Sequence, residues 1–496
     1  MAPPSPASPP RRPRILFLAA VILLSACGDE SQRRGRAVLF ASGADLLSIN
    51  PLVTDHPLAR QVQRYVLLLT LARYDSTLTP QPYLARSWQW SEDGHALTFH
   101  LRTDVRWHDG VPTTARDVVW TLNAARDPAT GYPRMSQLRG VTAVTALNDS
   151  TVVLRLASAP PPPVQGFPDV LTDLAIVPAH LLDSVPHARL RTAAWNAHPI
   201  GNGPFRFVLH EANRRWVFAR NPDFPAELGG PPLIEKLIVV VVDEPTIKLT
   251  ALVAGELDFA GINPQHAAFV RRRDGLAVRD YPLIYPFGLV LNTRRPPFND
   301  PRARLAAALA IDRQEIVDGY LFGYGVPANG PVPPDLPQYV PTPPVRLDPD
   351  SARRLVASLG ITPQFELLTV GSGEAPLEQM LQARLNAVGF DVRIRQLASS
   401  AFQDYVSGPR HDFSAAVMGI PGDPGLGFLQ RVGELTGVVL PVDPKAAQQV
   451  LAEQLPVIWL YHARGVQGMN QRVQGVQMDV RGELPTVTAW HIRAAQ

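Results

Sequence analysis

The sequence predicts an α/β protein with mixed sheets and more than one lobe. Alternating apolar and polar residues at 97–102 indicate a strand with one buried face, and the unbroken apolar run at 237–242 indicates a strand covered on both faces. Segments 365–370, 375–388 and 392–397 have the order strand, helix, strand, which implies parallel pairing through a right-handed crossover. Once a leader is removed, roughly 470 residues remain, more than one core usually supports, so two or three domains are expected.

The best-defined local pattern lies between residues 85 and 125. A turn signal at 92–94 separates a strand at 87–90 from the alternating strand that follows. Thr114 and Asp117 stand three residues apart, as in a capping box, and start a helix. This part of the chain is therefore expected to fold as two strands followed by a helix.

A second hairpin is expected after the turn at 199–204. Apolar residues alternate with polar ones before and after its tip, at 205–209 and 216–218. Beyond the buried strand at 237–242, the predicted elements are a helix at 246–254 that ends at Gly255 and a strand at 257–260.

The second half of the chain contains several helix starts. Asn299 and Asp312 are expected to be N-caps, and Asp312 is expected to form a capping box with Glu315. A helix at 350–359 precedes the strand–helix–strand unit, and a further strand is predicted at 412–418. The proline-rich stretches at 160–163 and 327–349 indicate rigid surface connections between these elements.

No motif for covalent or metal chemistry stands out. The chain has no His-Glu-x-x-His helix, no Walker loop and no Gly-x-Ser-x-Gly elbow. Gly201-Asn202-Gly203 begins like a dinucleotide fingerprint, but Arg206 stands where the third glycine belongs, so a role in turn geometry is predicted. The twelve histidines are scattered. We expect no catalytic residues, no metal site and no cofactor, and hence a protein that is not an enzyme.

The N-terminus predicts an export signal. Three arginines at 11–14 precede the apolar run Ile15–Leu24, which is shorter than the roughly 20 residues that span a bilayer. Small residues then lead to Cys27, the only cysteine of the chain. This pattern resembles a bacterial lipoprotein signal, and the alternative is an ordinary export signal with an incidental cysteine. We expect residues 1–26 to be the signal peptide and 27–36 a tether, with lipidated Cys27 holding the exported protein to a membrane, in the periplasm or at the cell surface.

The charge of the chain argues against a nucleic-acid partner. There are 47 Lys and Arg against 44 Asp and Glu, and removal of the signal takes away three arginines and no acid. A polyanion partner requires a clustered excess of basic residues. The run Arg271–Arg273 is short and is followed by Asp274, which is typical of a solvated helix face.

Five sequence blocks occur in order along the chain. They are Leu46–Pro51, Tyr74–Val118 with its Trp107-His108-Asp109-Gly110 turn, Pro199–Asp258 with Arg220-Asn221-Pro222-Asp223-Phe224, Pro297–Arg313, and Leu455–Tyr461. Together they resemble the extracellular solute-binding protein family 5, the peptide- and nickel-type receptors of ABC importers. Each block alone is weak, whereas five in order across most of the chain are specific.

This resemblance implies a fold of the type II periplasmic binding protein kind: two lobes of mixed sheet with flanking helices, plus an extra small domain. It places lobe I at 37–60, 175–285 and 455–496, the small domain at 61–174 and lobe II at 286–454. The implied function is the substrate-binding component of an ABC importer, a monomer that captures a small peptide or other polar solute by hinge closure and delivers it to the permease subunits. The alternative is an envelope sensor or scaffold lipoprotein that kept the fold but not ligand transport.

Two departures from the family pattern concern the second lobe. In peptide-binding relatives, an acidic residue shortly before an Asp-Pro pair receives the peptide's α-amino group. Ile420 occupies that position here, and Asp423 is the nearby candidate to replace it; a buried ammonium without a carboxylate is costly. The stretch between Phe428 and Leu455 is also shorter than in relatives, which predicts a trimmed lobe, a more open cleft, or a larger and less enclosed ligand.

Four residues are candidates for the ligand cleft because they follow predicted strands. Open α/β sheets bind ligands in the crevice beyond strand ends. The candidates are Asn50, Asn292, Arg294 and Asp423. For each of them, the alternative is a solvated loop residue.

Overall fold

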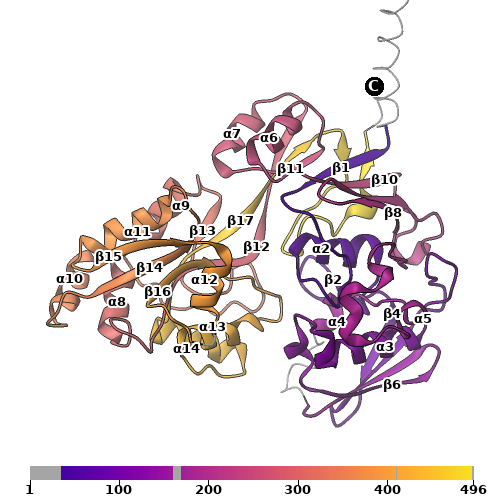
Figure 1. The fold of residues 1–496 in the computed structure, drawn as a ribbon, viewed down its shortest axis with the longest axis horizontal. Helices are drawn as coiled ribbons and strands as arrows, with labels where there is room; N and C mark the ends of the chain where they lie inside the picture. Colours follow the sequence, from indigo (N-terminus) through magenta and orange to yellow (C-terminus); the bar gives the residue numbers. More distant parts are fainter. Residues whose placement is uncertain (1–34, 160–168, 409, 494–496) are drawn as a thin grey trace, which may run out of the picture.

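The structure, a computed structural model, describes residues 35–159, 169–408 and 410–493. The predicted signal peptide, Cys27 and almost all of the tether lie outside these ranges. Figure 1 shows two lobes joined by a pair of long strands, with the first lobe on the right and the second on the left. The α/β class with mixed sheets and more than one lobe is therefore confirmed.

The first lobe is built on a mixed sheet. Strand β1 pairs in parallel with β10 and β11, and β9 and β8 extend the sheet as an antiparallel hairpin. The bounds of these strands are β1 (Ala37–Ser42), β8 (Phe205–Glu211), β9 (Arg215–Arg220), β10 (Lys236–Val241) and β11 (Phe259–Gly261). Beside them lie α2 (Pro57–Val62), a π-helical turn (Gln63–Leu67), α6 (Pro245–Val253) and α7 (Ala267–Arg271).

The small domain is an antiparallel sheet covered by a helix. Its strand order is β4-β5-β7-β6, and its members are β4 (Ala85–Trp90), β5 (Ala96–Leu101), β6 (Val141–Asn148), β7 (Thr151–Leu156) and α3 (Ala115–Arg126). The capping box of Thr114 and Asp117 is present at the start of α3. A two-stranded hairpin and two short helices lie next to this domain: β2 (Ala72–Tyr74), β3 (Pro80–Pro82), α4 (Val170–Asp173) and α5 (Ala179–Leu182).

The second lobe is a three-layer α/β/α unit. Its sheet contains β14 (Gln364–Val370), β15 (Asp391–Leu397) and β16 (Ala415–Gly419), and β13 (Gly325–Pro327) pairs at its margin. The parallel pairing of β14 with β15 through α11 (Pro376–Asn386) confirms the predicted strand–helix–strand unit. The other helices are α8 (Pro301–Ala310), α9 (Arg313–Gly319), α10 (Pro349–Ala357), α12 (Ser399–Val406), α13 (Phe428–Thr436) and α14 (Pro444–Gln454).

Two long antiparallel strands, β12 (Leu276–Leu291) and β17 (Val457–Asn470), pass from one lobe into the other. One half of this pair lies beside β11 of the first lobe and the other half beside β16 of the second. The register shifts between Pro282 and Pro286. Through this pair a single eleven-stranded sheet, ordered β15-β14-β16-β12-β17-β11-β1-β10-β9-β8 with β13 on β17, runs through both lobes.

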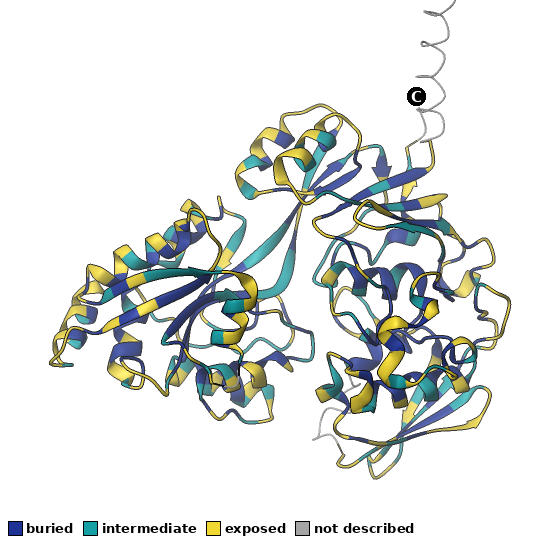
Figure 2. Ribbon diagram, in the orientation of Figure 1, coloured by how far each residue is buried: buried dark blue, intermediate teal, exposed yellow. Residues whose placement is uncertain are grey.

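Each lobe has its own apolar cores. Alternation along the second lobe's strands sends Leu367 and Ile458 to the face under α8–α11, and Leu368 and Trp459 to the face under α12–α14. In the first lobe, one core joins the sheet to the small domain and a smaller one lies under α6 and α7. Figure 2 shows dark blue stretches within the second lobe's sheet, teal along much of the crossing strands β12 and β17, and yellow on the outer faces of the helices.

The C-terminal residues return to the first lobe. Arg472 forms an ion pair with Asp258 at 2.5 Å, and the Trp490 ring stacks on Phe259 at 4.7 Å between centroids. The short strands β18 (Val473–Gln474) and β19 (His491–Ile492) pair with each other there. By contrast, the first residues of β17, Val457–Tyr461, pack in the second lobe's cores, whereas the predicted boundaries put all of 455–496 in lobe I.

Three local predictions need correction. The N-cap of α8 is Asp300 rather than Asn299, because the Asp300 carboxylate accepts from the backbone N of Arg302. Asp312 caps α9 as predicted, but the Glu315 side chain pairs with Arg384 instead of completing a capping box. Strand β10 is fully buried on one face only, since α6 and α7 cover the other face incompletely.

Candidate functional site

Asn50 braces a loop inside the first lobe. Its side chain is fully buried, its Nδ2 donates to Asn196 Oδ1 at 2.9 Å, and its Oδ1 accepts from the backbone N of Leu52 at 3.0 Å. These bonds pin the turn that follows β1. The structure therefore places Asn50 as a bracing residue inside the first lobe.

Asn292 and Arg294 brace the second lobe in a similar way. Asn292 Nδ2 donates to the carbonyl oxygens of His411 and Phe413, at 2.9 and 3.0 Å. The guanidinium of Arg294 donates to the carbonyl of Glu434 at 2.8 Å, in the last turn of α13, where a helix leaves its carbonyl oxygens unpaired and favours positive charge.

Of the four residues predicted to lie in the ligand cleft, Asp423 is the one that lines a cavity between the lobes. Only 6% of it is exposed, and its Oδ1 accepts from the backbone N of Gly427 at 3.0 Å. Among the described residues, no cationic side chain forms an ion pair with it. Ile420, the residue at the family's acidic position, is buried in the apolar core under α12–α14. Arg134 interacts with Asp423 electrostatically, but it forms no direct ion pair with it. A buried carboxylate without a direct cationic contact is unfavourable, so Asp423 is suited to receive a cationic group.

This interlobe cavity has a volume of about 400 Å³. It is lined from the first-lobe side by Asp55, Arg134, Gln137 and Arg139, and from the second lobe by Asp423, Phe428, Arg431 and Glu434. Both charge signs are represented on each wall. Such a lining suits a polar or zwitterionic solute better than an apolar one.

A charged cluster forms the first-lobe wall beneath the cavity. The Asp173 carboxylate forms ion pairs with three guanidinium groups, those of Arg60 at 2.7 Å, Arg64 at 2.6 Å and Arg134 at 2.9 Å. Arg134 also forms an ion pair with Asp55 at 3.0 Å. Burial alone would raise the pKa of Asp173, but the three guanidinium groups hold it well below its ordinary value. These bonds fix Arg134 at the edge of the cavity.

A second carboxyl group faces Asp423 across the lobes. Asp169 accepts a hydrogen bond from the Tyr74 hydroxyl. Burial, followed by the charges of Asp423 and Asp173, raises the pKa of Asp169 to about 7. A side chain at Gly425 would overlap the Asp169 carboxylate, so the two lobes are in direct contact at this point.

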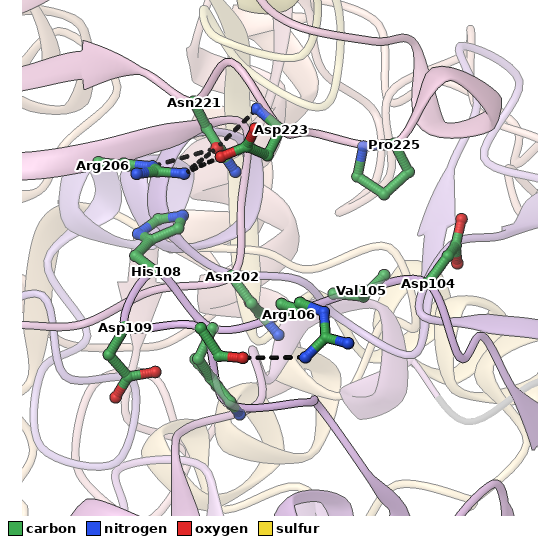
Figure 3. A pocket seen from close by; sticks show the side chains of 12 residues that line it. Asp104, Val105, Arg106, His108, Asp109, Asn202, Arg206, Asn221, Asp223 and Pro225 are labelled. Atoms are coloured by element: carbon green, nitrogen blue, oxygen red, sulfur yellow. Dashed lines mark hydrogen bonds and ion pairs between the residues drawn. The ribbon is translucent and has the colours of Figure 1, made fainter.

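Another cavity, of about 390 Å³, lies within the first lobe and its small domain (Figure 3). Its charged groups are already paired: Arg206 donates to Asn221 Oδ1 at 2.8 Å and to Asp223 at 2.6 Å, and Arg106 donates to the Gly110 carbonyl at 3.0 Å. His108 bonds to the Gly203 carbonyl, and burial lowers its pKa to about 4. Because these groups satisfy one another, the interlobe cavity is the better candidate for the ligand site.

Within the described part of the chain, no group of three or more His, Cys, Asp or Glu side chains is placed to hold a metal ion. None of the helices in the same ranges combines the length and the apolar character needed to cross a bilayer.

The family model of the bacterial extracellular solute-binding proteins, family 5, matches residues 79–436. The chain belongs to this family. It is therefore a solute-binding protein, and the prediction that it is not an enzyme is confirmed by the family to which it belongs.

Curated relatives of this family 5 protein span most of its length. A putative ABC transporter peptide-binding protein of Brucella ovis is 26% identical over 430 residues, which cover 82% of this chain and 78% of the relative. The di/tripeptide-binding protein 2 of Pseudomonas aeruginosa is 28% identical over 401 residues, covering 74% and 72% of the two chains.

Solved structures show the same fold at lower identity. NikZ from Campylobacter jejuni, in complex with Ni(L-His), has a TM-score of 0.77 and 22% identity, with 92% of this chain and 99% of NikZ covered. The oligopeptide-binding protein AppA from Bacillus subtilis, in complex with a nonapeptide, has a TM-score of 0.76 and 21% identity, with 93% and 99% covered. The predicted type II periplasmic binding protein fold is confirmed.

Sequence reasoning missed most of the interlobe wall. Asp169, Asp173 and the three arginines around Asp173 follow no predicted strand, and no motif marks them. The one available signal was the Asp423-Pro424 pair, which matches the family pattern and identified Asp423 as a residue of the cavity.

Proposed function

We propose that this family 5 protein is the substrate-binding component of an ABC importer, and that it captures short peptides or similar polar solutes between its lobes for delivery to the permease. The observation that carries the proposal is the cavity shared by the two lobes, whose wall contains buried Asp423, a carboxylate with no ion-pair contact among the described residues. Relatives named as ABC transporter peptide-binding and di/tripeptide-binding proteins support the same class of ligand.

Asp423 is proposed to receive the ammonium group of the ligand. An ammonium group on the ligand would form the direct ion pair with this carboxylate that no described side chain forms. Arg139 and Arg431 line the same cavity without an ion pair among the described residues and are proposed to receive a ligand carboxylate, whereas Arg134 is already paired with Asp55 and Asp173. In this arrangement Asp423 replaces the acid that the family pattern places at Ile420.

Capture is proposed to proceed by closure of the lobes about β12 and β17. These two strands cross between the lobes, and the register shift between Pro282 and Pro286 interrupts their hydrogen-bond ladder. An interrupted ladder is a natural place for the backbone to bend. Closure would bring the Asp423 wall against the Arg134 wall around the ligand.

The proposed location is the outside of the cytoplasmic membrane, with lipidated Cys27 as the anchor. The basic, apolar and small-residue order of positions 11–27 supports this. Lipidation by more than one acyl chain gives a stable membrane hold. Mass spectrometry of the N-terminal peptide would test it, because an unmodified Cys27 thiol in the exported protein would contradict lipidation.

Ligand binding can be tested with matched peptides. Isothermal titration of the purified protein with a panel of di- and tripeptides should detect binding, and N-acetylation of a bound peptide should abolish it. Asp423→Asn should weaken the affinity by more than about tenfold, because losing one partner of a buried charge pair costs about 2–5 kcal/mol. Asp412→Asn is the control, since Asp412 pairs with Arg295 on the exposed surface of the same lobe.

The competing function, a sensor or scaffold without ligand transport, makes a different prediction. In that case no peptide, oligosaccharide, nickel chelate or haem would raise the melting temperature, since only a ligand that binds the native state stabilises it.

The stretch between Phe428 and Leu455 forms two helices, α13 and α14, that pack into the second lobe, so this shorter region is fully folded.

A further inference from the structure

Leu78 occupies an unusual position at the tip of the hairpin between β2 and β3. Its backbone has a φ of 59°, in the left-handed region, where residues with a Cβ are uncommon because the side chain crowds the following carbonyl. Although it stands at a hairpin tip, only 7% of Leu78 is exposed. A strained and buried apolar residue at a hairpin tip indicates that something outside the hairpin covers it.

The covering residues belong to the other lobe. Leu78 is part of the apolar core under α12–α14, whose other buried members all lie between Val290 and Trp459. Leu336 and Pro337 of the second lobe border the same cavity as Leu78, next to Pro282 of β12 and Val480 of the C-terminal loop. The hairpin tip of the first lobe therefore contacts the second lobe beside the strand crossing.

The hairpin is held rigidly for this contact. Asp75 Oδ1 accepts from the backbone N atoms of Thr77 and Thr79, both at 2.9 Å, and its Oδ2 accepts from Gln81 Nε2 at 2.9 Å. Arg481 donates to the Tyr74 carbonyl at 3.0 Å, which ties the hairpin to the C-terminal loop. The hairpin that carries Leu78 is thus internally braced and tied to the C-terminal loop beside it.

We propose that Leu78 is a clasp that holds the two lobes together and biases the protein toward its closed arrangement. The proposal rests on the lobe closure proposed above, and adds that part of the closing free energy comes from the protein itself. When a protein already favours its binding-competent arrangement, less of the ligand's binding free energy is needed to close the lobes, and the apparent affinity is higher. Removing the clasp should shift the closed-to-open ratio by about tenfold, as expected from exposing a leucine side chain.

The test compares two leucines with the same backbone conformation. Leu78→Asn removes the apolar contact while keeping a residue that tolerates positive φ. Leu47→Asn is the matched control, because Leu47 has a φ of 61° but is 79% exposed. For each purified variant, the radius of gyration is measured by small-angle scattering, and amide exchange is followed in residues 332–340.

The expected result is a larger radius and faster exchange at 332–340 for Leu78→Asn, with no change for Leu47→Asn. An unchanged radius and unchanged exchange in Leu78→Asn would overturn the clasp. If circular dichroism shows that Leu78→Asn does not fold, the same two measurements on Val480→Asn test the clasp. Val480 packs beside the contact from the C-terminal loop.

A peptide titration separates this inference from the proposed function. If neither the wild-type protein nor Leu78→Asn decreases in radius when it binds a peptide, closure itself is wrong, because a wild type that the clasp already holds closed need not contract further. If the wild type contracts on binding but Leu78→Asn has the same radius as wild type without peptide, closure stands and the clasp fails.

Discussion

Three carboxyl groups meet where the lobes touch: Asp169 and Asp173 on the first lobe and Asp423 on the second. Asp173 is neutralised by three arginines, whereas Asp169 has the Tyr74 hydroxyl as its hydrogen-bond donor. Burial and the two neighbouring carboxylates raise the pKa of Asp169 from 3.8 to about 7. The folded protein therefore holds this proton more tightly than the unfolded chain.

The raised pKa makes stability depend on pH in a definite direction. As pH rises from about 4 to about 7, the unfolded chain loses the Asp169 proton and the folded protein does not, so the free energy of unfolding decreases. Asp169→Asn should remove this decrease. The variant should match wild type at pH 4 and exceed it at pH 8 by up to about 4 kcal/mol, at about 1.4 kcal/mol per pKa unit; urea denaturation at several pH values measures this.

Other titrations do not obscure that comparison. Burial lowers the pKa of His108 and of His462 to about 4, which makes stability fall as pH drops below about 6.5, but equally in wild type and variant. Asp149→Asn, at an exposed turn, should leave the wild-type profile unchanged. Parallel profiles for wild type and Asp169→Asn would show that Asp169 titrates normally.

Residue-level prediction succeeded where the signal is local. Thr114 caps α3 and Asp312 caps α9, because an N-cap depends on the next three or four residues. The cluster around Asp173 could not be predicted in this way. Arg60 and Asp173 are 113 residues apart, and only the folded chain brings them together.

At the scale of elements, the two crossing strands show why half of β12 and β17 was missed. The second-lobe halves, 287–291 and 457–461, are apolar runs because both of their faces are buried. In the sequence they stood out only as the apolar run before Asn292 and as the family block Leu455–Tyr461. The other halves carry charged residues, including the Arg464–Asp280 pair at 2.6 Å, and β12 contains two prolines. Strands without a continuously buried face lack the hydrophobic period that sequence analysis depends on.

The Gly201-Asn202-Gly203 segment has the role in turn geometry that its sequence predicted. The backbone N atoms of Asn202 and Gly203 donate to the Leu67 carbonyl, at 3.1 and 2.8 Å, and close the end of the π-helical turn at 63–67. Asn202 Oδ1 accepts from the backbone N of Leu69 at 3.0 Å. The glycines permit this close approach, because a Cβ on Gly201 would lie 2.1 Å from the Leu67 carbonyl oxygen.

Gly201→Ala should therefore destabilise the first lobe. The obstructing atom is a backbone oxygen that cannot rotate away, so the cost is expected at the upper end of the usual 1–3 kcal/mol for overpacking, about 3 kcal/mol. Gly330→Ala is the control, because no heavy atom lies within 4 Å of its Cβ position. Urea denaturation of both variants measures the difference, and equal midpoints would contradict the close approach.

At the scale of the whole molecule, the sequence predicted the fold class and the family but not how the lobes are joined. Strand order within a sheet depends on contacts between distant segments, and periodicity gives no information about them. The structure shows one sheet running through both lobes, while the buried cores divide between them. A continuous backbone ladder favours unfolding of both lobes in a single transition. Separate buried cores favour two transitions, one for each lobe.

We expect the separate cores to dominate, so that the lobes unfold in two transitions. Trp490 is fully buried in the first-lobe core and Phe298 in the second-lobe core. Replacing either by alanine should cost about 3–5 kcal/mol, which corresponds to about 10 °C for a lobe of this size. Trp490→Ala should lower one calorimetric transition, and Phe298→Ala should lower the other.

The opposite outcome would also identify its cause. If each variant shifted a single endotherm, the lobes would unfold as one unit, and the coupling would have to pass through the β12–β17 ladder and the contacts of Leu78 and Asp169. Leu147→Ala, at a residue that is 68% exposed, controls for the substitution itself. Because a ligand held between the lobes would stabilise both, a binding peptide should bring two separate transitions closer together.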